Sequence, residues 1–268
     1  MSGTVVVDPA LIERADLVER SVQVGWSAAL RSVDGNPLDI EIGEFPGAVA
    51  VRAGHDDDPF YNRAFGVEAH ESNLDAISRW FASVGVSPRI EVIPHLATEP
   101  LLRGLGELGL ACTGFNSTFV ASIDEGSSRP PADDREVTVS RVALEEFVET
   151  VLEVSGASFE PLMAPATEIS VRHDGPDWSL YRASLAGRTC GWARMRILDG
   201  AAALCGANVA EHSRRAGAQL ALLRQRVADA VAAGCDIAVA QAEPGTTSQR
   251  NMERFGLQLA YHKAVWTH

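Results

Sequence analysis

Two arginines and a glycine stand together just before a helical pattern in the second half of the chain. Arg214, Arg215 and Gly217 are followed by apolar residues that recur every three or four positions, at Leu220, Leu223, Val227 and Val231. The first turn of a helix leaves about four backbone N–H groups without intrahelical partners and carries the positive end of the helix dipole. Such a turn, with two guanidinium groups beside it, suits a pyrophosphate. Taken alone, the same residues also fit an ordinary helix start with basic surface side chains.

The elements around this turn can be predicted from apolar runs and capping residues. Strands are expected over 201–210, 235–242 and 258–266, and helices from Arg215–Gln219 to Gly234 and over 247–255. Threonine and serine residues cap the second of these helices, and Gly256 ends it. The predicted phosphate site therefore lies between two strands, at the start of the helix that joins them.

This order of elements resembles the GNAT N-acetyltransferase superfamily. The resemblance rests on three motifs: Arg214-x-x-Gly217-x-Gln219 before the first helix, Ser248-x-x-Asn251 on the second, and Phe255-Gly256-Leu257 after it. It implies an α/β (α+β) fold with a central mixed sheet flanked by helices. It also implies acetyl-CoA as cosubstrate and no metal.

The resemblance further implies which residues would contact acetyl-CoA. Backbone groups near Asn208 and Val209 would hold the pantetheine arm, and the N–H of Val209 would polarise the thioester carbonyl. Ser248 and Asn251 would lie near the far end of the cofactor. The pyrophosphate would be held by the turn itself, at Arg214, Arg215, Ala216, Gly217, Ala218 and Gln219.

The chain departs from the family pattern at two positions. Gln219 stands where members carry a small residue, and its side chain could crowd the phosphate. Met252 stands where many members carry a tyrosine that protonates the leaving thiolate, and a thioether cannot donate a proton. The sequence therefore names no general acid or general base, and water is the remaining candidate for the base.

Candidate residues for the acceptor lie between 155 and 173, in the segment that the family uses on the substrate side. Phe159 and Glu160 could line an acceptor pocket, since loops on a rigid scaffold often carry function. His173 is a further candidate, although a His-Asp pair before Gly-Pro also fits turn chemistry. His212, beside the phosphate turn, fits an exposed turn residue as well as a catalytic group.

Composition restricts the kind of protein. The chain has 268 residues, of which 46% are hydrophobic, and its apolar runs are shorter than the roughly 20 residues of a membrane helix. Its first residues lack the pattern of a secretory signal. Four cysteines are spaced singly, so we expect core residues and neither zinc ligands nor disulfides. We expect a cytoplasmic protein with no membrane partner.

A polar, proline-rich stretch divides the chain. We expect a linker over 125–134, extended in conformation, between a first unit over 1–124 and a GNAT acyl-CoA-binding catalytic unit over 135–268. The first unit is interpreted as a degenerate copy without a pyrophosphate loop, because its later elements repeat those of the second. They are strands over 47–52 and 89–93, helices over 72–84 and 99–108, and a long strand ending near Ile123.

Charge is unequally divided. Residues 1–134 hold 9 of the 23 basic residues but 21 of the 36 acidic ones. A nucleic-acid partner is therefore not expected. The acidic half could draw a cationic amine toward the acyl donor, or the charge could serve solubility alone. Asn62 and Arg63 are candidates for a contribution of the first half to the cleft.

The sequence thus predicts an acetyl-CoA-dependent N-acetyltransferase that acts on a primary amine of a small molecule, by direct attack on the thioester. The alternative is a non-catalytic module that binds or senses acyl-CoA. Neither the acceptor nor the oligomeric state follows from the sequence.

Overall fold

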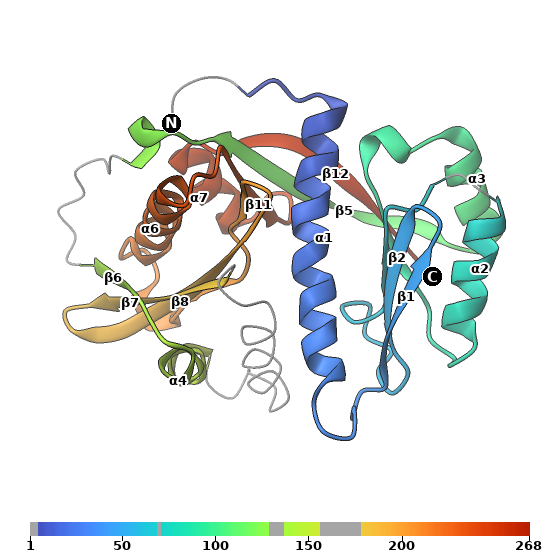
Figure 1. Ribbon diagram of the computed structural model, residues 1–268, viewed down its shortest axis with the longest axis horizontal. Helices are drawn as coiled ribbons and strands as arrows, with labels where there is room; N and C mark the ends of the chain where they lie inside the picture. Colours follow the sequence, from blue (N-terminus) through green and yellow to red (C-terminus); the bar gives the residue numbers. More distant parts are fainter. Residues whose placement is uncertain (1–4, 69–70, 129–136, 156–177) are drawn as a thin grey trace.

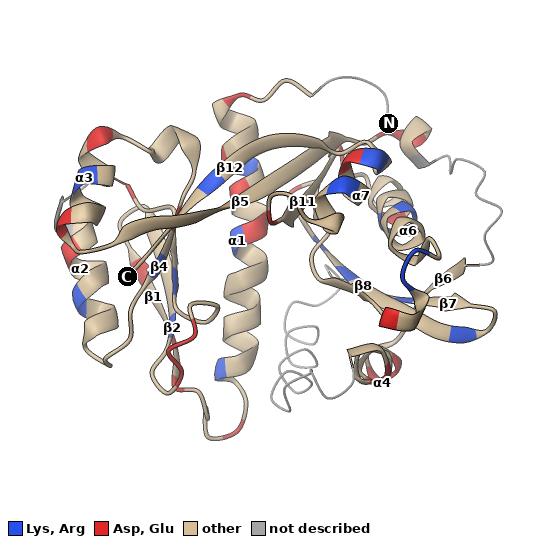
Figure 2. Cartoon of the chain, turned by 180° about the vertical axis from the view of Figure 1, so that it is seen from behind, with Lys and Arg blue, Asp and Glu red and all other residues tan. Residues whose placement is uncertain are grey.

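One mixed sheet runs through the molecule and joins its two halves. In the computed structural model, which describes residues 5–68, 71–128, 137–155 and 178–268, the sheet has twelve strands. Eleven of them follow the order β1-β2-β3-β4-β12-β5-β11-β9-β8-β7-β6, and β10 pairs with β8 beside this path. Helices cover the sheet on both faces, as the views from the front (Figure 1) and from behind (Figure 2) show. The expected α/β fold with a central mixed sheet is confirmed.

The first half contains three elements that the sequence did not predict: the long helix α1, the strand β1 and the short strand β3. Its other helices and strands lie within two residues of their predicted bounds. In chain order the elements are α1 (Pro9–Arg31), β1 (Ile40–Phe45), β2 (Ala48–Ala53), β3 (Arg63–Phe65), α2 (Glu71–Ala82), β4 (Arg89–Val92), α3 (Glu99–Glu107) and β5 (Ala111–Ser122).

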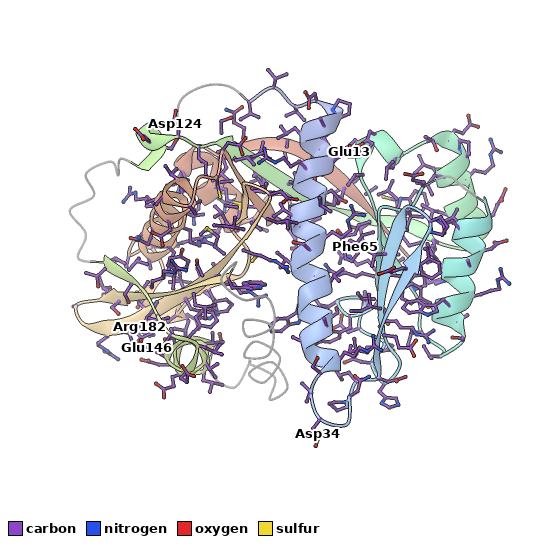
Figure 3. The ribbon with its side chains drawn as sticks, in the orientation of Figure 1. Glu13, Asp34, Phe65, Asp124, Glu146 and Arg182 are labelled. Atoms are coloured by element: carbon purple, nitrogen blue, oxygen red, sulfur yellow. The ribbon has the colours of Figure 1, made fainter. Side chains whose placement is uncertain are left out.

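The second half follows the predicted order from residue 201 onward. Its elements are β6 (Val137–Arg141), α4 (Leu144–Ser155), β7 (Trp178–Leu185), β8 (Arg188–Leu198), β9 (Ala201–Ala203), β10 (Ala207–Val209), α6 (Ala218–Ala232), β11 (Ile237–Ala242), α7 (Thr247–Phe255) and β12 (Gln258–Thr267). Arg182 on β7 and Glu146 on α4 form an ion pair at 2.5 Å, which ties this helix to the sheet (Figure 3).

Two sequence predictions are wrong in detail, and a third is confirmed. The strand expected over 201–210 is interrupted, because Gly206 takes a φ of +56° and the chain turns from β9 into β10. The helix expected to begin within Arg215–Gln219 does so, at Ala218, with Gly217 as its N-cap at a φ of +91°. The linker expected to be extended begins with a 3-10 turn over Glu125–Ser128, where Asp124 and Ser127 bond each other.

The order strand, helix, strand, helix, strand occurs twice, which confirms the tandem repeat. In the first copy it is β3-α2-β4-α3-β5, and in the second it is β9-α6-β11-α7-β12. The two copies exchange their last strands: β12 lies between β4 and β5, and β5 lies between β12 and β11. The division into units 1–124 and 135–268 remains a prediction, and this exchange was not predicted.

Helix α1 lies between the two halves, in front of the crossing of β5 and β12 (Figure 1). Its start carries a capping signal, because Asp8 accepts a hydrogen bond from the N–H of Leu11 and Pro9 occupies the first helical position. It packs its apolar stripe on β5, β9 and β11. Arg14 on α1 also bonds Asp236, so the helix is held by the second half.

The sheet separates two layers of helices in the second half. Alternating residues of β5, β9 and β11 face α6 and α7 on one side and α1 on the other. Helix α4 packs on Leu180 and Trp192, on the face of the sheet opposite to Tyr181 and α6. This layering leaves α1 as the first-half element nearest to the strands that surround the predicted donor site.

Candidate active site

Two neighbouring strands separate at the predicted donor site. β9 pairs in parallel with β11 only from Ile237 to Val239, and the N–H of Leu204 then donates to the Val239 carbonyl at 2.8 Å. Beyond this bond the chain passes into β10, which pairs with β8. The backbone edges of β10 and of β11 from Ala240 onward therefore diverge, and an extended molecule can lie between them.

The N–H of Val209 points into this gap. Along β10 and β8 the residue pairs 206–194 and 210–190 are hydrogen-bonded, because Arg194 N–H donates to Gly206 and Ala210 N–H donates to Cys190. An antiparallel ladder alternates bonded and non-bonded pairs, so Val209, opposite Gly191, directs its N–H away from β8. This is the direction that the predicted contact with a thioester oxygen requires. The contact itself remains a prediction.

The turn before α6 presents backbone donors. Within the described part of the chain, no acceptor bonds the N–H groups of Gly217, Ala218 or Gln219. Arg215 takes a φ of +69° and is exposed, as is Arg214, whose Nη1 lies 3.6 Å from Glu211. Free N–H groups at a helix start with exposed guanidinium groups beside them can bind a pyrophosphate.

The side chain of Gln219 is bonded to helix α7. Its Nε2 lies 3.4 Å from Ser248 Oγ, and its Oε1 accepts a hydrogen bond from Asn251. These bonds hold the side-chain amide of Gln219 against α7. The bulky side chain therefore fits at this position of the turn. The structure thus brings three predicted residues together, and the side chains of Ser248 and Asn251 bond Gln219.

The remaining predicted positions have different surroundings. Met252 is 6% exposed and belongs to the core of the second half, so it contributes packing and no proton. Phe159, Glu160 and His173 lie outside the described residues. Asn62 is fully buried and bonds the backbone of Ala53, Asp56 and Asp58, which is a structural role.

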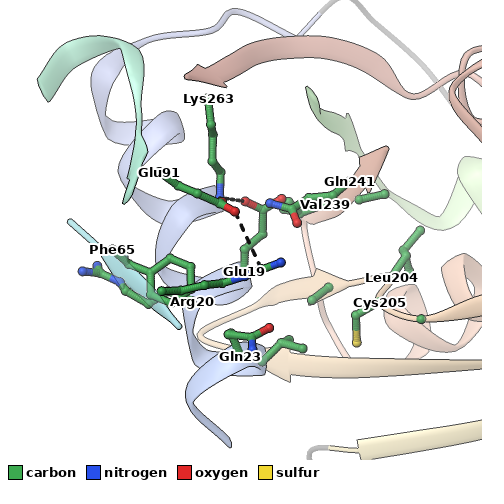
Figure 4. Close-up of a pocket in the computed structure, with 15 residues that line it drawn as sticks. Glu19, Arg20, Gln23, Phe65, Glu91, Leu204, Cys205, Val239, Gln241 and Lys263 are labelled. Atoms are coloured by element: carbon green, nitrogen blue, oxygen red, sulfur yellow. Dashed lines mark ion pairs between the residues drawn. The ribbon is translucent and has the colours of Figure 1, made fainter. Parts of the chain in front are cut away.

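A cavity of about 150 Å³ lies between the two halves. Its second-half wall is formed by the diverging strands, at Ala203–Gly206 and Val239–Gln241, so the gap between β10 and β11 opens into it. Its first-half wall comes from α1, β3 and β4. Figure 4 shows Lys263, Glu19 and Glu91 pointing toward one another. The charged residues that line it are Glu19, Arg20, Arg63, Glu91 and Lys263.

Lys263 lies at the centre of a buried charge cluster. Its Nζ is 2.8 Å from Glu19, 3.4 Å from Asp16 and 3.7 Å from Glu91. These carboxylates and the ammonium group compensate the burial that would otherwise disfavour each charge. Burial opposes the charge on Lys263, but the surrounding carboxylates outweigh it and raise the pKa of Lys263 above its usual value.

Of the three carboxylates around Lys263, Glu19 has the fewest positively charged partners among the described residues. Within the described residues Lys263 is its one cationic partner, whereas Glu91 also pairs with Arg89 and Arg63. Burial therefore raises the pKa of Glu19 to about 7, and the opposing effect of Lys263 does not cancel it. Burial also acts on Glu91, but its three cations together lower the pKa of Glu91. Glu19 also accepts a hydrogen bond from Thr118 at 3.2 Å.

A carboxylate with a pKa near 7, at the wall of a cavity, can accept a proton from an acceptor amine. The sequence analysis did not identify Glu19, although two signals could have done so. Asp16 and Glu19 interrupt the apolar stripe of α1, and Lys263 occupies the inward side of β12 between Tyr261 and Val265. A charged side chain at a core position needs a partner of opposite charge. Here Lys263 pairs with Asp16 and Glu19.

Of the histidine and cysteine residues considered in the sequence, Cys205 lines the cavity, and His212 and the other three cysteines do not. His212 is exposed in a 3-10 turn. Cys190 and Cys235 are buried as expected, Cys112 is exposed, and Cys205 lines the cavity.

In the described ranges no three His, Cys, Asp or Glu side chains form a group that could hold a metal ion. No described helix is long and apolar enough to cross a membrane.

Comparison with known proteins identifies the fold. No protein-family model matches the chain, and no curated protein matches it. A GCN5-related N-acetyltransferase from Kribbella flavida is 18% identical and superimposes with a TM-score of 0.64, over 91% of this chain and 95% of that one. A GCN5-related N-acetyltransferase from Sphaerobacter thermophilus is 15% identical, with a TM-score of 0.59 over 96% and 93%. A tandem GNAT protein from the clavulanic acid biosynthesis pathway is 13% identical, with a TM-score of 0.59 over 95% and 96%.

Proposed function

We propose that this chain, which has the tandem fold of the GCN5-related N-acetyltransferases, is an acetyl-CoA-dependent N-acetyltransferase that acts on a primary amine of a small molecule. One observation carries the proposal: the gap between β10 and β11 opens into the cavity that Glu19 lines. A donor bound at the turn before α6 and extended along this gap would deliver its thioester to that cavity.

The residues of the turn fit the donor. The N–H groups of Gly217, Ala218 and Gln219 would bind the pyrophosphate, with Arg214 and Arg215 adding charge at the exposed rim. The N–H of Val209 would donate a hydrogen bond to the carbonyl oxygen of the thioester and stabilise the negative charge that develops on it. Gly217 would allow close approach of the phosphate, because no Cβ projects from it.

Glu19 would prepare the amine for attack. A protonated amine has no lone pair, so it first gives one proton to the Glu19 carboxylate. The neutral nitrogen then forms a bond to the carbonyl carbon, and the C–S bond breaks with its electron pair leaving on sulfur. The nitrogen loses a second proton, and the thiolate gains one as the thiol. Aligning the two reactants contributes to this step as well, by about 7–11 kcal/mol in favourable cases.

The alternative function is acyl-CoA binding or sensing without transfer, which would use the same turn. Release of free thiol from acetyl-CoA in the presence of amines distinguishes the two functions. We expect amine-dependent release, while a sensor would bind acetyl-CoA and release none.

Calorimetric titration with acetyl-CoA tests the donor site. Gly217→Glu places a side chain and a negative charge where the phosphate would bind, so we expect at least a 100-fold loss of affinity. Gly234→Glu is the matched control, because Gly234 ends the same helix at a φ of +82° with open space around it. Equal affinities of the Gly217 variant and the wild type would remove the basis of the proposal.

A further inference from the structure

The cavity between the halves has more positive than negative charge. Arg20, Arg63 and Lys263 contribute three cations, and Glu19 and Glu91 two carboxylates. The charges directly behind this wall, Asp16 and Arg89, cancel each other. The acidity of the first half therefore does not extend to the cavity, and a ligand with an anionic group is favoured there.

Arg20 has unused hydrogen-bonding capacity. It follows Glu19 on α1, and its one ionic contact among the described residues is with Asp16, at 3.7 Å. This distance exceeds that of a hydrogen bond. The guanidinium group lies against the loop after β3, since a Cβ added at Gly66 would come within 2.6 Å of Arg20 Nη1. The loop thus limits where the group can move, while its donors remain available.

Arg63 lies on the first-half wall of the cavity and also has unused hydrogen-bonding capacity. Its Nη1 is 3.7 Å from Glu91, and its buried Nε bonds no acceptor in the described part of the chain. The ring of Phe60 lies 5.0 Å from its guanidinium carbon and holds the side chain in place. A guanidinium group has five N–H donors, so both arginines can bind the oxygens of a carboxylate.

We propose that the acceptor is a small α-amino acid whose carboxylate is bound by Arg20 and Arg63 and whose amine faces Glu19. This inference rests on the proposed function for the fate of the amine, which is acetylated once Glu19 has taken its proton. The binding preference itself follows from the cavity. Glu19 and Arg20 are adjacent on α1 and both line it, which suits two opposite charges on one carbon atom.

Other small acceptors fit less well. A plain amine would satisfy Glu19 but leave the donors of both guanidinium groups unpaired, which carries a cost in a partly buried site. A phosphate or dicarboxylate would satisfy the arginines but bring a second negative charge toward Glu19 and Glu91. A volume of about 150 Å³ excludes a folded partner. An amine and a carboxylate close together match both sets of groups.

Calorimetry on the full chain, without acetyl-CoA, tests the preference. The probes are the common L-α-amino acids, each compared with its carboxamide and with the amine that lacks the carboxylate. We expect at least one amino acid to bind about 10- to 100-fold more tightly than its carboxamide, as for hydrogen bonds to a charged group. No amino acid binding, or carboxamides and amines that bind equally well, would overturn the proposal.

Two variants assign the preference to the arginines. Arg20→Gln and Arg63→Gln should each weaken the binding of the preferred amino acid about 10-fold or more, and leave the binding of its carboxamide within about 2-fold. Arg103→Gln is the control, since Arg103 is exposed on α3 and pairs only with Glu99 among the described residues. An equal loss for amino acid and carboxamide in both variants would contradict the assignment.

The two proposals can fail separately. If the protein binds an amino acid in this way but releases no thiol from acetyl-CoA, the proposed transfer is wrong and the ligand class stands. If thiol is released with plain amines as efficiently as with amino acids, the transfer stands and the ligand class is wrong.

Discussion

Oε2 of Glu19 on α1 lies 2.8 Å from Nζ of Lys263 on β12, so the first helix of the chain is bonded to its last strand. Both side chains are buried, and Lys263 is the only lysine in the sequence. The pair lies in the wall of the cavity where the two halves meet (Figure 4). The exchange of β5 and β12 between the halves brings these residues together, since β12 belongs to the second half and pairs with β4 of the first.

Glu19→Gln should slow acetyl transfer and change its pH dependence. In the wild type the rate should rise through about pH 7 as Glu19 loses its proton and becomes a base. The glutamine variant should lack this limb and be about 10²- to 10⁴-fold slower. Rates measured from pH 5.5 to 9 with a fixed acceptor check this.

Glu13→Gln is the control for this variant, because Glu13 lies on the same helix with a side chain that is 68% exposed (Figure 3). Its rate and pH profile should equal those of the wild type. A Glu19→Gln profile with the wild-type limb near pH 7 would show that another group takes the proton.

The same ionisation should affect stability. The folded pKa of Glu19, about 7, lies above its usual value of 4.5, so the folded protein holds this proton between pH 4.5 and 7 while the unfolded chain releases it. The contribution of Glu19 to the free energy of unfolding is then present below pH 4.5 and is lost as pH rises to 7, by on the order of 3 kcal/mol.

Urea unfolding of the wild type and Glu19→Gln at several pH values measures this contribution. The difference in unfolding free energy between the two proteins should shift in favour of the variant as pH rises across that window. A constant difference would mean that the pKa of Glu19 is the same in the folded and unfolded chain. The single Nζ resonance of Lys263 offers an independent record of the titration, because no other lysine contributes a signal.

Arg214→Ala and Arg215→Ala should weaken acetyl-CoA binding in a salt-dependent manner. Both residues are exposed beside the turn, so their attraction for a phosphate is screened as the Debye length falls to about 8 Å at 0.15 M salt. The loss should be largest at low salt. Calorimetry at three salt concentrations checks it, with Arg103→Ala as an exposed control, and a loss that is independent of salt would argue against phosphate contact.

Met252→Ala should destabilise the protein without moving the pH profile of the rate. Met252 is buried in the core of the second half, where truncation to alanine costs about 2–5 kcal/mol. A thioether does not titrate, so both limbs of the profile should keep their wild-type positions. A shifted limb would indicate that Met252 orders an ionising group nearby.

Local patterns predicted the elements of the second half well. Thr246 caps α7, which begins at Thr247 and ends at Phe255 as the sequence indicated, because a cap and a following glycine define a helix from its own residues. The start of α6 was predicted only as lying within Arg215–Gln219. A helix start depends on the backbone angles of Arg215 and Gly217, and apolar periodicity does not report these angles.

The cavity between the halves could not be predicted in the same way, because its residues are far apart in the sequence. Glu19, Glu91 and Lys263 meet only after β12 has inserted between β4 and β5. That exchange depends on long-range pairing, which short patterns leave undetermined. The residues of the donor turn, by contrast, follow one another in sequence, so a motif could identify them.

The most direct test of the account is an experimental structure of the protein with CoA bound. We expect the pyrophosphate within hydrogen-bond distance of the N–H groups of Gly217, Ala218 and Gln219, the pantetheine arm between β10 and β11, and the sulfur at the mouth of the cavity that Glu19 lines. CoA bound at another surface, or with its sulfur directed away from this cavity, would contradict the proposal that donor and acceptor meet between the two halves.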